Sequence, residues 1–233
     1  MNTERTPESS VAARASAEHA PLSAPTLHAR LRESTAAQHR DTESRSFISA
    51  LMGGDLALAD YVRYLAQYAY VYRALEAREA QPGDPALVDD ARLHRFPAIA
   101  SDLIALGAAD WECAHLPLPA TAVYVDRLTS LAPTDVPRYL AHHYTRYLGD
   151  LSGGQAIASL VARHYGATAD QLSFYRFEAI DNPAAFKREY REGINTLDFD
   201  EAQAQALIAE AQAAFDCNAA IFDELGQASA PVH

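Results

Sequence analysis

Apolar residues recur every three or four positions through most of this chain, which is the period of an amphipathic α-helix. The pattern predicts long helices over residues 27–47, 56–80, 135–165, 184–197 and 200–225. Alternating apolar and polar runs of strand length are absent from the sequence, as are Asn-Gly and Asp-Gly hairpin turns. The pattern therefore predicts an all-α fold.

The two ends of the chain differ in composition from the rest. Residues 1–25 are rich in Ala, Ser, Pro, Glu and Arg and lack hydrophobic periodicity, which predicts a disordered N-terminal tail. We expect residues 26–226 to form one domain and residues 227–233 to be a flexible C-terminal tail. No internal repeat is present.

Glycines interrupt the middle of the third long helix. Each of Gly149, Gly153 and Gly154 costs about 1 kcal/mol relative to Ala in a helix interior. Arg146, Gly149, Asp150 and Gly153 are spaced to share one face. That face offers a bare backbone strip around one carboxylate, against which a flat group could lie. Close packing of two helices is an equally weighted alternative from these residues alone.

The first long helix places Arg32, Thr35, His39 and Glu43 on one face. Glu43 lies one turn after His39 and could accept its second ring proton, the arrangement common for metal-bound imidazoles. Arg32 lies two turns before His39 and could meet an anionic group on the same ligand. The alternatives are a solvated histidine and an ordinary charged surface.

Polar residues also mark the later helices. Lys187 and Arg191 are one turn apart beside an apolar stripe, which is consistent with a clamp for an anion such as a carboxylate or with a solvated edge. Asn218 interrupts the apolar stripe of the last helix. A buried amide must find hydrogen bonds, for which Tyr72, Arg146, Asp150 or ordered water are candidates. The predicted stripes are Tyr61, Leu65, Tyr68, Tyr72 and Leu75 in the second helix, and Ala204, Leu207, Ala211, Phe215, Asn218, Phe222 and Leu225 in the last.

Composition limits the class of protein. The net charge of −12 argues against binding to nucleic acid or an anionic membrane. No apolar run approaches the roughly 20 residues that span a bilayer, and the first residues contain no apolar core of a signal peptide. Cys113 and Cys217 lack metal-ligand spacing and suit a reducing compartment. We therefore expect a cytoplasmic monomer.

Several segments resemble the biliverdin-forming haem oxygenases of the bacterial type. They are LRESTAAQHRDTE, YVYRALE, HHYTRYLGDLSGGQ, FKREYREGINTL and AFDCNAAIF, in the same order and at similar separations. The resemblance covers roughly residues 27–225, and its most specific part is YTRYLGDLSGGQ. It implies a single-domain helical bundle with haem between the first helix and a glycine-kinked distal helix.

The resemblance also implies roles for individual residues. His39 matches the iron ligand and Glu43 its acidic neighbour. Gly149 and Gly153 match the distal glycines, whose backbone lies close to the iron-bound oxygen. Asp150 matches the distal carboxylate that organises proton-delivering waters.

Two further groups of residues follow from the resemblance. The rest of the proton network matches Tyr72, Arg146 and Asn218, and the propionate-binding residues match Arg32, Tyr144, Lys187 and Arg191. Tyr144 is in tension with this assignment, because on a straight helix it points well away from Gly149 and Asp150. A bend at the glycines or a different height along the helix would have to reconcile them.

The family's reaction uses haem as both cofactor and substrate. Dioxygen and electrons from an external donor, a ferredoxin or a flavin-type reductase, convert haem to biliverdin, carbon monoxide and ferrous iron. The alternative is a haem carrier or sensor without turnover on the same fold. The complete proton network of Tyr72, Arg146 and Asp150 favours the enzyme, because a carrier has no need of it.

Overall fold

The computed structural model describes residues 24–228, and within them every regular element is a helix. The predicted all-α single-domain fold is confirmed. Most of the tail predicted over residues 1–25, and residues 229–233 of the other, lie outside the described residues. The long elements are α1 (Leu27–Glu43), α2 (Ser46–Gly53), α3 (Leu58–Glu76), α4 (Phe96–Ala105), α6 (Pro119–Thr129), α7 (Val136–His143), α8 (Gly149–Tyr165), α9 (Pro183–Asn195) and α10 (Glu201–Ala228).

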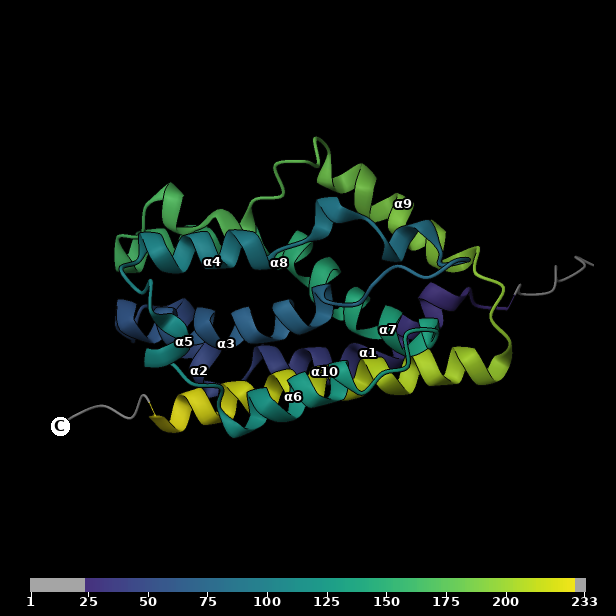
Figure 1. Ribbon diagram of the computed structural model, residues 1–233, viewed down its shortest axis with the longest axis horizontal. Helices are drawn as coiled ribbons and strands as arrows, with labels where there is room; N and C mark the ends of the chain where they lie inside the picture. Colours follow the sequence, from purple (N-terminus) through teal and green to yellow (C-terminus); the bar gives the residue numbers. More distant parts are fainter. Residues whose placement is uncertain (1–23, 229–233) are drawn as a thin grey trace, which may run out of the picture.

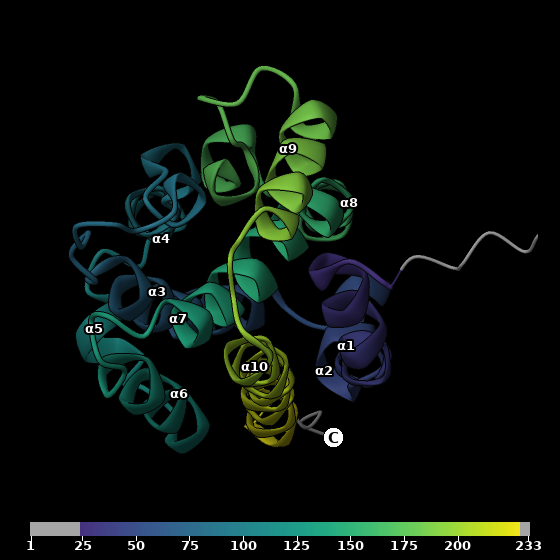
Figure 2. The ribbon, with the colours of Figure 1, turned by 90° about the vertical axis from the view of Figure 1, so that its right-hand side faces the viewer.

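The last helix, α10, is the spine of the bundle. It packs against α1, α2, α3, α6 and α7, and it runs the length of the molecule (Figure 1). Its Leu207, Ala211 and Leu225 are almost fully buried, as the sequence predicts. Figure 2 shows α1 and α2 on one side of α10, with α8 and α9 together at one end of the view. The helix continues to Ala228, two residues beyond the predicted domain end.

The first predicted helix is shorter than the pattern suggested. The prediction of one helix over residues 27–47 is wrong, because α1 ends at Glu43 and α2 begins at Ser46. The Ser44 hydroxyl donates to the Asp41 carbonyl at 2.8 Å, a local bond that competes with the helix. Arg45 then adopts an extended backbone with ψ 141°. The break turns Phe47 and Leu51 into the core.

The glycine-bearing helix contains a widened turn. Between α7 and α8 the chain forms a π-helical turn, η3 (Tyr144–Leu148), whose hydrogen bonds span five residues. The irregularity lies just before Gly149 and not at the glycines, where the sequence suggested a bend. On a straight α-helix, residues five apart point about 140° away from each other. The π turn brings them closer to one face, which resolves the conflict over Tyr144 and Gly149.

The other predicted helices keep their apolar faces. The helix predicted over residues 56–80 is α3, and the stripe that contains Tyr61, Tyr68 and Tyr72 is buried in the core. Two short 3₁₀ turns, η4 (Ala169–Gln171) and η5 (Ser173–Tyr175), follow α8. Other short elements of the described chain are η1 (Ala86–Val88), η2 (Ala91–Leu93) and α5 (Trp111–Ala114).

Candidate functional site

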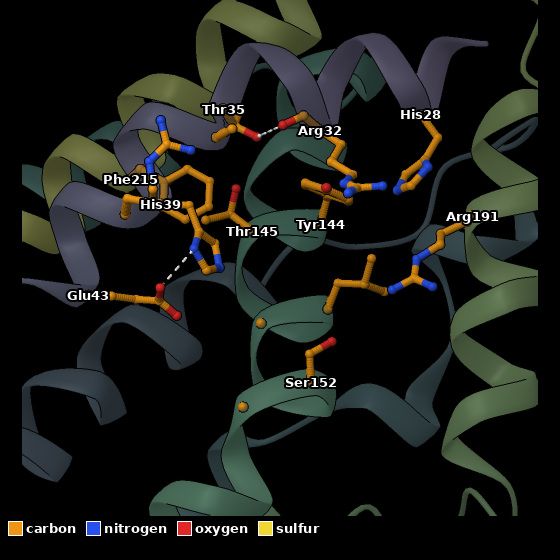
Figure 3. Close-up of a pocket in the computed structure, with 15 residues that line it drawn as sticks. His28, Arg32, Thr35, His39, Glu43, Tyr144, Thr145, Ser152, Arg191 and Phe215 are labelled. Atoms are coloured by element: carbon orange, nitrogen blue, oxygen red, sulfur yellow. Dashed lines mark hydrogen bonds and ion pairs between the residues drawn. The ribbon is translucent and has the colours of Figure 1, made fainter. Parts of the chain in front are cut away.

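A cavity of about 710 Å³ separates α1 from η3 and the first turn of α8. Figure 3 shows α1 on one side of it, the glycine-bearing turn opposite, and α9 closing one end. The volume is that of a typical site for a cofactor-sized ligand. Of the predicted site residues, those that line the cavity are Arg32, His39, Glu43, Tyr144, Gly149, Gly153 and Arg191.

His39 presents one ring nitrogen to this cavity. Its Nδ1 lies 3.2 Å from a carboxylate oxygen of Glu43, one turn further along α1. Because a carboxylate only accepts, Nδ1 of the neutral ring carries the proton and Nε2 keeps a free lone pair. The ring packs edge-on against Phe215 at 5.6 Å, and its side chain is half exposed. In Figure 3 it points across the cavity, so His39 is oriented as a ligand for a metal bound there.

The glycines opposite His39 fall into two groups. A Cβ built on Gly149 or Gly153 meets no atom within 4 Å, so both face open space. A Cβ on Gly154 would lie 3.1 Å from Cδ1 of the buried Tyr175 ring. Gly154 is therefore closely packed, against a side chain of η5 and not of a second α-helix, whereas Gly149 and Gly153 leave open space on their side of the helix. Gly149 and Gly153 form the bare wall that a flat group needs.

Cationic side chains gather at the end of the cavity that α9 closes. Arg32 of α1 and Arg191 of α9 line it, and neither side chain has a hydrogen bond or ion pair with another residue of 24–228. Tyr144 lines the same end of the cavity, is half-buried, and is drawn beside Arg32 in Figure 3. Two guanidinium groups with unused donors match a ligand that carries carboxylates at one edge.

Lys187 does not join this group in the described structure. Its ammonium donates to the Leu151 carbonyl at 3.2 Å and lies 3.5 Å from Oγ of Ser152. These contacts connect α9 to α8 beside the cavity. Its predicted contact with a propionate would require the side chain to leave these acceptors.

A buried hydrogen-bond network lies behind the glycine wall. The Tyr72 hydroxyl donates to a carboxylate oxygen of Asp150. Arg146 donates from Nε to the Tyr72 hydroxyl at 3.2 Å and from Nη1 to Oδ1 of Asn218 at 2.8 Å. The predicted network residues are thus brought together, on α3, η3, α8 and α10. None of these four lines the cavity directly.

The network fixes the protonation of its members. Burial raises the pKa of the Asp150 carboxyl, and the Arg146 charge and the Tyr72 hydrogen bond oppose that rise. Burial also raises the pKa of Tyr72 well above its usual value, so its hydroxyl stays protonated and donates. Asp150 accepts from Tyr72, and its carboxyl is more basic than that of a solvent-exposed aspartate.

Sequence reasoning missed several members of the site. The Tyr68 hydroxyl donates to Asn218 at 2.7 Å, and the Arg146 guanidinium stacks 4.3 Å from its ring centroid. Tyr68 lies one turn from Tyr72 in the same stripe, a spacing that could have revealed it. Phe215, predicted as core, is instead half-buried in the cavity wall. His28 and Ser152 also line the cavity, and no sequence pattern marks them.

The helical bundle places one free imidazole nitrogen opposite a bare glycine wall, with two cations at one end, an arrangement suited to a flat metal-containing ligand that carries carboxylates. The family model described as heme oxygenase matches residues 25–224. The haem oxygenase of Guillardia theta is 32% identical over 203 residues, 85% of this chain and 86% of that relative. This chain belongs to the haem oxygenase family.

Solved structures agree with this assignment. The haem oxygenase of Leptospira interrogans is 32% identical and superposes with a TM-score of 0.81, covering 86% of this chain and all of that one. Haem oxygenase-1 of the cyanobacterium Synechocystis, solved in complex with haem, is 31% identical with a TM-score of 0.80. That match covers 88% of this chain and 94% of the other.

Proposed function

We propose that this chain cleaves haem to biliverdin, carbon monoxide and ferrous iron. The observation that carries the proposal is the placement of His39 across the cavity from Gly149 and Gly153, with the carboxylate-binding cations at one end. Haem is a flat dicarboxylate with a metal at its centre, so each wall of the cavity meets the part of haem that it suits. Bound haem supplies the iron at which dioxygen is reduced.

The residues of α1 hold and tune the iron. His39 would bind it through Nε2, and Glu43 would fix the ring orientation through Nδ1. A cysteine thiolate donates strongly to iron and thereby favours cleavage of the O–O bond. A neutral imidazole donates less electron density. A histidine ligand such as His39 would therefore suit oxidation of the porphyrin itself better than a thiolate would.

The opposite wall controls protons through water. Gly149 and Gly153 place no side chain in the cavity opposite His39, so no acidic side chain of this wall would touch the centre of a ligand bound there. Asp150, one layer behind, would hold a water and pass protons through it, with its position set by Tyr72 and Arg146. Asn218 and Tyr68 complete the support by holding Arg146. Relayed transfer delivers protons more slowly than a direct acid would.

At the edge of the cavity, Arg32, Tyr144 and Arg191 would bind the propionates. Lys187 joins them only if its ammonium exchanges the Leu151 carbonyl for a carboxylate. A ligand held at this end has its rotation in the pocket fixed, and that rotation determines which meso carbon is attacked.

The reaction consumes dioxygen and reducing equivalents that side chains do not supply. We therefore propose an external electron donor, a ferredoxin or a flavin-type reductase, and a cytoplasmic monomer as the working form. The free thiols of Cys113 and Cys217 support a reducing compartment. Among residues 24–228, no helix is long and apolar enough to cross a bilayer.

Absorption spectra of haem titrated into the protein test the assignment of the iron ligand. The wild type should give the Soret band of a histidine-ligated haem, and His39→Ala should lose that ligation and most turnover. His115→Gln is the matched control, because His115 lies at the end of α5 and outside the cavity. Unchanged ligation spectra in His39→Ala would refute the role of His39.

A further inference from the structure

An additional histidine lies at the cationic end of the cavity. His28, in the first turn of α1, lines the cavity with Arg32 and Arg191. Its ring meets Tyr144 edge-on, with centroids 6.0 Å apart and planes at 67°. Figure 3 shows the imidazole beside the Arg32 guanidinium and above that of Arg191. His28 therefore shares the space in which a carboxylate edge would lie.

The position of His28 is fixed by another helix. Its backbone N–H donates to Oδ1 of Asn195, the last residue of α9, at 3.0 Å. The same helix carries Arg191 and Glu192, so α1 and α9 hold the imidazole and the guanidinium groups in one constellation. The ring is half-buried, and no described residue engages its nitrogens in a hydrogen bond.

The charges around the ring determine its state without a ligand. Burial, Arg191 and Arg32 lower the pKa of His28, and Glu192 opposes them. Tyr144 contributes a neutral hydroxyl, since burial raises its pKa. The imidazole is thus neutral beside two cations near pH 7.

A dianionic ligand reverses this balance. Two carboxylates placed among Arg32, Arg191 and Tyr144 would offset both guanidinium charges and add acceptors for an imidazole N–H. Protonation of the ring then becomes favourable. One proton passes from solvent to the imidazole, and both carboxylates stay ionised.

We propose that His28 is a third cationic contact for the carboxylate edge of the ligand, and that it takes up a proton from solvent as that ligand binds. The inference rests on the proposed function, because it assumes a porphyrin with two propionates in this cavity. His28 would then bind the carboxylate edge directly, couple haem affinity to pH and fix the rotation of the porphyrin in the cavity.

The pH dependence has a definite sign. An imidazole whose pKa rises on binding adds affinity at low pH, and this addition is lost as the pH rises through the pKa of the bound state. A rise of one unit corresponds to a tenfold change in affinity. As the pH rises from 6 to 8, loss of the His28 proton should therefore weaken haem binding to the wild type by up to about tenfold.

The test compares the wild type with His28→Gln, His28→Leu and the control His115→Gln. Proton uptake is measured with a pH indicator when haem is mixed with each protein in weak buffer near pH 7. The wild type and His115→Gln should take up more protons per haem than His28→Gln, by up to one. The ratio of the haem dissociation constants at pH 8 and pH 6 should be smaller in both His28 variants than in the wild type. His28→Leu should bind haem more weakly than His28→Gln.

Iron-free protoporphyrin separates this end of the cavity from iron ligation. It keeps both propionates, so the His28 effect on proton uptake should persist with it. Equal uptake and equal pH slopes in the wild type and His28→Gln, with normal His39 ligation, would overturn the inference and leave the proposed function intact. Failure of the wild type to bind haem through His39 would overturn both. Thermal melting of the apoproteins establishes that the variants are folded.

Discussion

Asp150 lies one layer behind the cavity wall, where we propose that its carboxylate holds a water and does not touch the ligand. The Tyr72 hydroxyl and the Arg146 guanidinium determine its position, and only 12% of its side chain is exposed. Residues of this kind act through geometry, so removing one should change the outcome of the reaction more than the binding of haem.

Asp150→Ala should retain haem, because His39 and the carboxylate-binding end are unchanged. Its biliverdin yield at a fixed early time should fall by about a hundredfold, because general acid–base assistance of this kind contributes at least that much to the rate. Yield per haem is measured by chromatography after aerobic reduction. Asp170→Ala, an exposed residue of η4, should behave as the wild type. A normal yield from Asp150→Ala would contradict the relay.

Local spacing was sufficient to predict part of the site. Glu43 lies one turn from His39, and the structure joins them at 3.2 Å. The partners of Asn218 were also predicted in part, since Arg146 is one of them. The place of His28 in the cavity could not be predicted, because it depends on contacts with Asn195 and Arg191, which lie on a helix more than 160 residues away.

At the scale of the element, the central feature is the glycine-bearing helix, whose irregular turn and glycines have different structural effects. The π turn η3 rotates Tyr144 onto the face of Gly149, and the glycines leave that face bare. Helical periodicity predicted the helix and the shared face, but it assumes a constant 3.6 residues per turn. A π turn has no strong sequence signal, so neither it nor its effect on Tyr144 could be predicted.

Alanine substitutions separate the two kinds of glycine. Gly149→Ala and Gly153→Ala should keep or raise the free energy of unfolding of the apoprotein, by up to about 1 kcal/mol, because alanine is the better helix former and its Cβ meets open space. Both should lower haem affinity, because the methyl group enters the cavity. Chemical denaturation and haem titration measure the two effects.

Gly154→Ala is the matched control within the same helix. Its Cβ would press on the buried Tyr175 ring, so the gain in unfolding free energy should be smaller or reversed, and haem affinity should be kept. Haem affinity that falls for Gly154→Ala but not for Gly149→Ala would show that the ligand lies on another face.

At the scale of the whole molecule, α10 unites the elements that form the site. One link is Glu210, buried between α6 and α7. It accepts from Arg127 at 2.5 and 2.8 Å and lies 2.8 Å from Nε2 of His142, two residues before the π turn. Burial opposes ionisation, but the hydrogen bonds from His142 and Arg127 outweigh it and lower the pKa of Glu210 to about 2.

The ionised Glu210 should contribute to the pH dependence of the free energy of unfolding in acid. A carboxyl whose pKa is lowered on folding stabilises the protein above its unfolded value near 4.5, and the contribution is lost as the pH falls toward 2. Allowing for solvent screening, it is on the order of 2 kcal/mol. Glu210→Gln should lack this part of the pH dependence and be less stable at pH 7. Exposed Glu33→Gln should keep it, and identical pH profiles for Glu210→Gln and the wild type would refute the assignment.

The fold as a whole was predictable because its helices carry strong periodic patterns and its core residues follow them. What periodicity could not supply were the contacts between distant segments. The orientation of α9 over the cavity and the Glu210 link depend on packing between segments far apart in the chain, and the Ser44 break depends on a local side-chain hydrogen bond that periodicity does not register. The residues of the candidate site that the sequence predicted are those that the family resemblance assigned. The disordered N-terminal tail and the flexible C-terminal tail remain predictions.

Aerobic incubation with haem and a reductant tests the central claim most directly. The products are followed by absorption, by chromatography for biliverdin and by detection of carbon monoxide. A haem oxygenase should lose its Soret band and release biliverdin, one carbon monoxide and one ferrous iron per haem. A Soret band that persists in reduced, oxygenated protein, with neither product released, would contradict the account and identify a haem carrier or sensor.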